Sequence, residues 1–202
     1  MMRGLQIAVA ALLLALTFAA PALADTHDAF LTAKDEWGLF TGYGETIPDM
    51  GATRSRIQAV DLVGRYGYFL TNEIGGDSWY RGRHEFMVEL PVSYVYSPEG
   101  AVMVGLHFFA VWNFTSPKGF VPYVFGGGGP IYTNLHVPEL SREWDGSYQF
   151  GAGVKWPTGV ELLGRRVALD LNCRYHHISN ASTSRPNGPL NSIRLRLGLL
   201  LL

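Results

Sequence analysis

The chain has 202 residues, of which 48% are hydrophobic, 13% aromatic and only 16% charged. A soluble domain usually carries about 25% charged residues, so this composition is poor in charge. The net charge of −1 excludes a strongly basic nucleic-acid-binding domain and an acidic disordered tail. The single cysteine, Cys173, excludes a disulfide framework and a cysteine-based zinc site.

The first 24 residues have the pattern of a secretory signal peptide. A short positive start precedes an apolar run over residues 5–18, and Ala22-Leu23-Ala24 is the small-x-small pattern that signal peptidase cuts. A membrane anchor is the alternative, but polar residues interrupt the run and Pro21 ends it. We expect a signal peptide over 1–24 and a mature domain over 25–202. After the signal peptide no stretch approaches the ~20 apolar residues of a spanning helix, so a membrane form must use strands.

Period-two alternation of apolar and polar side chains dominates the rest of the chain and predicts β-strands. Between Ala101 and Phe114, for example, one face is apolar throughout, while the other includes His107 and Asn113. The clearest alternating stretches are 85–96, 101–114, 147–156, 167–176 and 192–201. Weaker stretches at 37–44, 57–71 and 120–132 bring the number of predicted strands to eight.

Eight antiparallel strands of this length can close into a barrel. In a soluble barrel the apolar faces would surround a ligand, whereas in an outer-membrane barrel they would contact lipid and the charges would pair inside. Alternation alone does not separate the two.

Three features favour the membrane barrel: low charge, aromatic residues near strand ends such as Tyr94, Trp112 and Trp156, and strand charges of both signs. These charges are Asp61, Glu89 and Asp170 against Arg65, Lys155, Arg174, Arg194 and Arg196. We predict an all-β, eight-stranded antiparallel up-and-down transmembrane β-barrel. Its C-terminal Leu202 departs from the aromatic residue with which such barrels commonly end.

Three polar residues fall on the apolar face near the end of the chain. His177 and Ser179 share the parity of Cys173, and Asn191 shares that of Ile193. Polar groups facing hydrocarbon are costly unless they bind each other or serve a purpose. Positions i and i+2 on one strand face bring an imidazole within reach of a hydroxyl, as a serine nucleophile and its base require. The alternative is that these residues simply lie at the rim, above the bilayer.

The residues around this pair carry a resemblance. Residues 175–181 read Tyr-His-His-Ile-Ser-Asn-Ala, and residues 186–191 read Pro-Asn-Gly-Pro-Leu-Asn. This stretch resembles the outer-membrane lipid A 3-O-deacylases (the PagL family), which are eight-stranded barrels with a His-x-Ser site on the outer wall. The resemblance implies that His177 is the general base, that Ser179 is the nucleophile toward an ester of lipid A, and that Asn180 helps to hold the oxyanion.

Two positions depart from the family pattern. The family has a glutamate twelve residues after the serine, where this chain has Asn191, and it tends to have a glycine three residues after the serine, where this chain has Ser182. An asparagine can orient an imidazole but cannot balance its charge, and a serine offers its backbone N–H over a narrower range of conformations than glycine. Reduced activity, altered ester preference and an inactive barrel are all open alternatives.

The expected function is hydrolysis of an ester-linked acyl chain of lipid A, at the 3-O position by resemblance, in the outer leaflet of a Gram-negative type outer membrane. The expected partners are lipid A, lipopolysaccharide and membrane lipid, after signal-peptide cleavage near Ala24; we expect no cofactor, metal or nucleic acid.

The alternative is a non-catalytic structural or adhesive barrel that acts through loops 45–56 and 132–146. The acids Glu139, Glu143 and Asp145 are expected in a solvated loop. The segment 71–84, too long for a periplasmic turn, has no assigned role.

Overall fold

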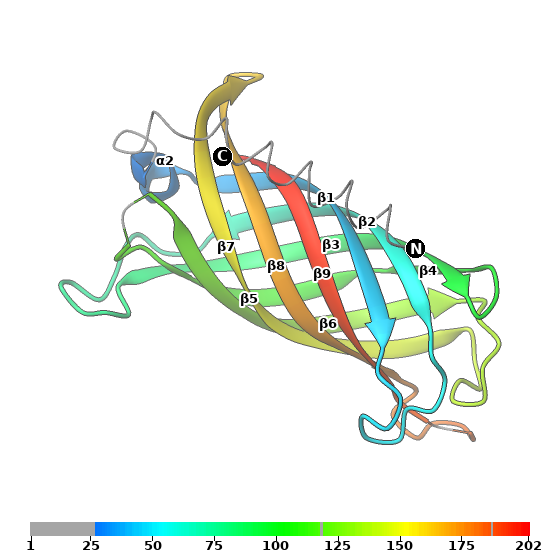
Figure 1. The fold of residues 1–202 in the computed structure, drawn as a ribbon. Helices are drawn as coiled ribbons and strands as arrows, with labels where there is room; N and C mark the ends of the chain where they lie inside the picture. Colours follow the sequence, from blue (N-terminus) through cyan, green and yellow to red (C-terminus); the bar gives the residue numbers. More distant parts are fainter. Residues whose placement is uncertain (1–26, 118, 187) are drawn as a thin grey trace.

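A computed structural model describes residues 27–117, 119–186 and 188–202 as a closed antiparallel barrel (Figure 1). A six-residue helix, α2 (His27–Thr32), precedes the strands. The strands are β1 (Asp35–Thr46), β2 (Gln58–Phe69), β3 (Gly82–Ser97), β4 (Ala101–Gly105), β5 (His107–Phe114), β6 (Val121–Thr133), β7 (Trp144–Leu162), β8 (Arg165–Ser179) and β9 (Leu190–Leu201). The predicted signal peptide lies outside the described residues. In the part of the chain that is described, no helix is long and apolar enough to cross a membrane.

The strands pair with their neighbours in chain order, and β1 pairs with β9 to close the ring. Strands β4 and β5 form one position in this ring, because both lie between β3 and β6. The interruption falls at Leu106, whose N–H donates to the carbonyl of Pro130 at 3.1 Å. Proline has no N–H to return, so the ladder breaks there. The ring therefore has eight strand positions, and the predicted all-β antiparallel barrel is confirmed.

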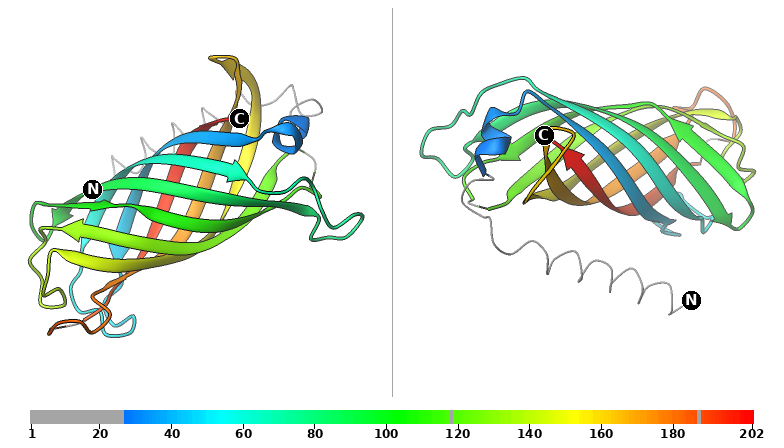
Figure 2. Two further views of the ribbon diagram at one scale, coloured as in Figure 1. Left: turned by 180° about the vertical axis from the view of Figure 1, so that it is seen from behind. Right: turned by 90° about the horizontal axis from the view of Figure 1, so that it is seen from above.

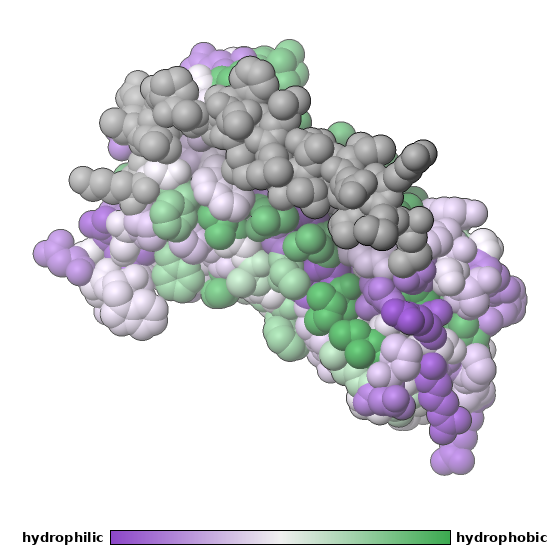
Figure 3. Space-filling model, in the orientation of Figure 1, coloured by the Kyte–Doolittle hydropathy of each residue, from purple (hydrophilic) through white to green (hydrophobic). Residues whose placement is uncertain are grey.

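The charged side chains of the strands lie inside the barrel, as the alternation predicts. Glu89 accepts hydrogen bonds from Arg65, Arg174 and Arg196, and all four side chains are buried. Further inside pairs join Asp61 to Arg194 and Arg196, Asp170 to Arg65, and Lys155 to Glu36 and Glu85. Apolar side chains cover the outer wall, where green patches lie between more polar ends in Figure 3.

The two ends of the barrel differ. We call the end that carries α2, the C-terminal end of β9 and segment 70–81 the helix end (Figure 2). The opposite end carries the connections 47–57, 98–100, 134–143 and 180–189, and we call it the loop end (Figure 1). The end of β8 and the beginning of β9, which carry the predicted site residues, both lie at the loop end.

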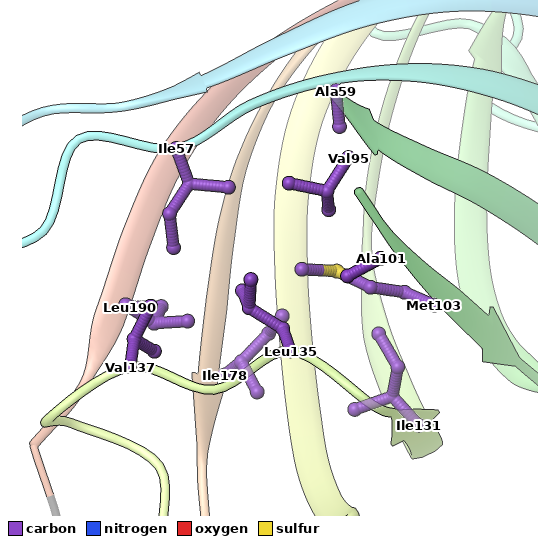
Figure 4. Packing of buried hydrophobic residues seen from close by; sticks show 10 residues of the cluster. All are labelled: Ile57, Ala59, Val95, Ala101, Met103, Ile131, Leu135, Val137, Ile178 and Leu190. Carbon is purple, nitrogen blue, oxygen red and sulfur yellow. The ribbon is translucent and has the colours of Figure 1, made fainter. Parts of the chain in front are cut away.

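A cluster of buried apolar side chains fills the barrel beneath these loops (Figure 4). Leu135 and Val137 come from the 134–143 loop and pack with Ile178 of β8 and Leu190 of β9. Ile178 and Leu190 point inward, so the strand neighbours Ser179 and Asn191 have the opposite parity. The cluster therefore packs against the inner side of the part of the wall whose outer side carries the predicted site.

Segment 70–81 is an ordered loop at the helix end. Its Glu73 carboxylate accepts from the Thr115 hydroxyl, and the Trp112 indole N–H donates to the Tyr80 carbonyl at 3.2 Å. The Trp79 ring stacks on Phe114 and is 80% exposed. Trp79 and Tyr80 therefore extend the row of outer-wall aromatics at this end, as in an interfacial girdle.

Candidate active site

The three predicted site residues meet on the outer wall at the loop end. His177 and Ser179 are the last two outward-facing residues of β8, and Asn191 is the second residue of β9. His177 and Asn191 are directly opposite each other in the β8–β9 ladder. Outward parity and this register bring the three side chains together without any loop rearrangement.

The hydrogen bonds run in one chain from asparagine to serine. Nδ1 of His177 lies 2.7 Å from Oδ1 of Asn191, and Nε2 lies 2.9 Å from Oγ of Ser179. An amide oxygen only accepts, so the proton belongs on Nδ1. Nε2 is then free of a proton and accepts from the Ser179 hydroxyl. This is the tautomer that a general base beside a serine nucleophile needs.

Asn191 is fixed by contacts on three sides. Its Oδ1 accepts a second hydrogen bond from the Tyr175 hydroxyl at 2.6 Å, and its Nδ2 donates to the carbonyl of Met50 at 2.8 Å. The Asn191 backbone N–H donates to Oγ1 of Thr53 at 2.9 Å. Although its parity is outward, Asn191 is only 4% exposed, because the 47–57 loop covers it. The Met50 carbonyl selects the amide orientation that turns Oδ1 toward His177.

Tyr148 of β7 covers the His177 ring. The two residues are directly opposite in the β7–β8 ladder, and their ring centroids lie 4.4 Å apart with planes inclined by 22°. Tyr148 also packs against Tyr175, at 6.1 Å between ring centroids. Stacking on one side and two hydrogen bonds at the ring edge leave the imidazole little freedom to turn.

The side chain of Asn180 points into the loop. Its Nδ2 donates to Oγ of Ser141 at 2.9 Å, to the hydroxyl and carbonyl of Ser184, and to the carbonyl of Pro186. These contacts engage the side-chain amide nitrogen within the loop, so the side-chain donor of Asn180 points away from Ser179 and its backbone N–H is the donor that remains next to the nucleophile in the chain.

The two residues after Asn180 adopt a left-handed backbone. Ala181 has φ of 51° and Ser182 has φ of 63°. Glycine adopts this region without steric cost, whereas residues with a Cβ do so rarely. Ser182 thus occupies a glycine-like conformation at the position where the family pattern tends to have glycine.

Glu139, in the 134–143 loop, forms hydrogen bonds with the 47–57 and 180–189 loops. Its Oε1 accepts from the N–H groups of Arg54 and Ser55, and its Oε2 accepts from the Ser55 hydroxyl at 2.8 Å. Its backbone carbonyl accepts from the N–H of Gly188. Burial opposes the charge, but the hydrogen bonds from Ser55 and Arg54 outweigh it and hold the pKa of Glu139 below its ordinary value.

The expected solvated loop is therefore wrong for Glu139, which is 3% exposed, and for Asp145, which is buried in β7. Glu143 does lie in the 134–143 loop. The polarity of these residues suggested solvent, but Glu139 is buried by its contacts with the 47–57 and 180–189 loops, and Asp145 has the inward parity of β7.

No group of three or more His, Cys, Asp or Glu side chains in the described ranges is placed to hold a metal ion. The chemistry available here is that of a hydroxyl, an imidazole and an amide. The sequence pattern predicts these three groups, but it does not point to Tyr148, Met50 and Thr53. Tyr148 could have been found from the strand register opposite His177; Met50 and Thr53 lie in a loop that no periodicity describes.

A protein-family model described as lipid A 3-O-deacylase (PagL) matches residues 64–199, well over half of the chain. The chain belongs to the PagL family. The PagL match runs from β2 to β9 and includes His177, Ser179 and Asn191. The predicted resemblance is confirmed, and membership places the chain among the outer-membrane lipid A deacylases at the level of the family.

Two crystal structures have a similar fold. That of the outer membrane enzyme PagL has a TM-score of 0.57 and 15% identity, and the match covers 80% of this chain and 97% of that one. That of Neisserial surface protein A (NspA) has a TM-score of 0.56 and 14% identity, and covers 84% and 97%. At these identities the likeness establishes the barrel fold alone. No curated protein matches this PagL-family chain.

Proposed function

We propose that this chain hydrolyses an ester-linked acyl chain of lipid A, at the 3-O position that the family name gives, with Ser179 as the nucleophile and His177 as the general base. The observation that carries the proposal is the hydrogen-bonded Ser179–His177–Asn191 row on the outer wall. A serine hydroxyl is a weak nucleophile until an adjacent base takes its proton. The His177 Nε2, 2.9 Å from Oγ, is within reach to do so.

The reaction would proceed in two halves. Oγ of Ser179 attacks the ester carbonyl while Nε2 of His177 takes the hydroxyl proton, and the C–O bond to the sugar breaks as His177 returns that proton to the leaving sugar oxygen. The acyl group is then on Ser179. A water molecule, deprotonated by His177, attacks the acyl carbon, and the fatty acid leaves as Ser179 regains its proton.

The oxyanion of each tetrahedral intermediate needs hydrogen-bond donors. The backbone N–H of Asn180 follows the nucleophile directly in the chain. The side chain of Asn180 is held by Ser141 and Ser184, which fixes the peptide on which that donor lies. We assign the oxyanion to this backbone group.

The position of the site suits a lipid substrate. Longer loops of outer-membrane barrels are extracellular, and three long connections, 47–57, 134–143 and 180–189, lie at the loop end, whereas segment 70–81 is the single long connection described at the helix end. This distribution would put the loop end at the outer leaflet, where lipid A resides. Below the site the outer wall is apolar, with exposed Phe150, Cys173, Ile193 and Leu195. An acyl chain can lie along this wall within the lipid phase while its ester reaches Ser179, so no enclosed pocket is required.

Mass spectrometry of lipid A from a Gram-negative host tests the proposal. Cells that express the wild type should contain lipid A lighter by one hydroxyacyl group, while Ser179→Ala and His177→Ala should leave lipid A unchanged. Ser116→Ala, a serine at the helix end, is the matched control and should behave as wild type.

A non-catalytic barrel is the second candidate. It is favoured by the neutral Asn191 and by a likeness to NspA as close as that to PagL. Unchanged lipid A with wild-type protein correctly inserted in the membrane would support it. We also propose that residues 1–24 are removed on export, so that the intact mass of the purified protein should correspond to a chain that begins at Asp25.

A further inference from the structure

The proposed chemistry creates a positive charge that the site does not balance with an acid. When His177 takes the serine proton it becomes an imidazolium ion. Among the described residues, its ring forms hydrogen bonds with Asn191 from β9 and Ser179 on its own strand, and stacks on Tyr148 from β7. None of these is a carboxylate. Glu45 on β1 projects from the same wall, but its carboxylate is bound to Arg56 and to the Tyr43 hydroxyl.

Tyr148 presents its ring face to His177. The centroids are 4.4 Å apart and the planes are nearly parallel, at 22°. The face of an aromatic ring is negative, and it attracts a cation within ~6 Å of its centroid. The attraction is stronger away from water, and here the Tyr148 ring is on the apolar outer wall.

We propose that Tyr148 is a positioning residue that stabilises the His177 imidazolium through its ring face, where Asn191 leaves that charge unbalanced. The catalytic part of this inference rests on the proposed function. We assign this role to the Tyr148 ring and not to its hydroxyl, because it is the face of the ring that stacks on His177.

The backbone around Tyr148 is built to hold the ring in this place. Register alone puts Tyr148 opposite His177. On the other side of β7, Gly128 of β6 is opposite Tyr148, and a Cβ at Gly128 would lie 2.8 Å from the Tyr148 Cα and 2.0 Å from the carbonyl oxygen of Ser147. A glycine is needed there to let β6 approach, so the position of the Tyr148 backbone is closely defined.

Kinetics of purified variants on lipid A test the catalytic part. Tyr148→Phe keeps the ring face and should stay within about twofold of wild type. Tyr148→Leu should lower kcat/KM about tenfold, or about 1.4 kcal/mol in the barrier, mainly through kcat. Phe86→Leu in β3, an exposed outer-wall ring stacked on Phe108 of β5 and away from the site, is the matched control and should change kcat little.

The pH profile separates this role from simple packing. His177 must be neutral to act as a base, so activity falls at low pH as the imidazole is protonated. Without the ring face the imidazolium is less stable, and the acidic limb of kcat/KM should move to lower pH in Tyr148→Leu but not in Tyr148→Phe. In an Asn191→Asp background, where a carboxylate balances the charge, the loss caused by Tyr148→Leu should shrink to about twofold.

A titration that needs no turnover tests the inference separately from the proposed function. The ring signals of His177, followed by NMR in detergent micelles, should titrate at lower pH in Tyr148→Leu than in wild type, with Tyr148→Phe unchanged. An unchanged midpoint in Tyr148→Leu would overturn the role of Tyr148 even if the enzyme is active. A shifted midpoint in a protein that leaves lipid A intact would keep this inference and refute the deacylase.

Discussion

Asn191 makes more contacts than an orienting residue requires. It accepts from both His177 and Tyr175 through one oxygen and donates to the Met50 carbonyl through its nitrogen. A carboxylate at this position could not donate, and one of its oxygens would face the carbonyl oxygen of Met50. The 47–57 loop therefore suits an amide at position 191. Where the family has a glutamate, this chain has an asparagine whose nitrogen has its own acceptor, the Met50 carbonyl.

The Tyr175 hydroxyl helps to hold Oδ1 of Asn191 toward His177. Tyr175→Phe removes this hydrogen bond but keeps the ring, so kcat/KM on lipid A should fall about three- to tenfold, as expected for a bond of about 1 kcal/mol. Tyr68→Phe, an exposed tyrosine far along the wall in β2, should have no effect. Equal losses in both variants would refute the role of Tyr175.

Ser182 offers a test of backbone conformation. Its φ of 63° is unfavourable for a residue with a Cβ. Ser182→Gly and Ser182→Ala both remove the hydroxyl, so their difference isolates the Cβ. The glycine variant should be more stable than the alanine variant by about 1 kcal/mol in urea-induced unfolding. If alanine were the more stable of the two, the left-handed conformation would be wrong.

At the level of elements, one carboxylate joins two loops of the loop end that are far apart in the sequence. Glu139 binds the backbone of the 47–57 loop, and that loop in turn contacts Asn191 through Met50 and Thr53. The 134–143 loop also inserts Leu135 and Val137 into the barrel. The site therefore depends on a loop far away in the sequence, joined to it by Glu139.

Glu139→Gln should weaken the connection between the two loops, because an amide nitrogen cannot accept the hydrogen bond of the Ser55 hydroxyl. The pKa of Glu139 is lowered in the folded protein, so its stabilising effect is present above the unfolded pKa of about 4.3 and is lost as the pH falls through the lower folded value. Urea unfolding measured from pH 3 to pH 7 should show wild type more stable than Glu139→Gln near neutrality, with the difference vanishing toward pH 3. A difference that grows toward low pH would contradict this sign.

At the scale of the whole molecule, the barrel encloses charges and exposes apolar side chains. Glu89 is the centre of the inner network, since its two oxygens accept from Arg65, Arg174 and Arg196. Its replacement would leave three buried guanidinium groups short of one negative charge. Removal of one member of a buried ion pair costs about 3–5 kcal/mol.

Glu89→Gln should therefore lower the free energy of unfolding by about 3–5 kcal/mol, measured by tryptophan fluorescence against denaturant in lipid or detergent. Glu161→Gln, an exposed pair with Arg166 in the β7–β8 hairpin, should change it by less than about 1 kcal/mol. A loss at Glu89 no larger than that at Glu161 would rule out a structural role for the inner network.

The sequence predicts a large part of this molecule because strand alternation is a local property. It assigns Arg65 and Glu89 to the inside and His177 and Ser179 to the outside, and the structure agrees. It does not predict that Asn180 turns into the loop or that Glu139 is buried, because these depend on contacts between distant loops. The break at Leu106 also escapes it, since the cause, Pro130, lies on the neighbouring strand.

The proposed nucleophile is Ser179, an outward-facing serine on the barrel wall. A lipophilic fluorophosphonate reacts with an activated serine oxygen by loss of fluoride and leaves a stable adduct. After treatment of the folded barrel, peptide mass mapping should find this adduct on Ser179 in wild type, and its formation should be slowed at least about a hundredfold in His177→Ala. An adduct on other serines but not on Ser179, in protein that removes an acyl chain from lipid A, would show that Ser179 is not the nucleophile.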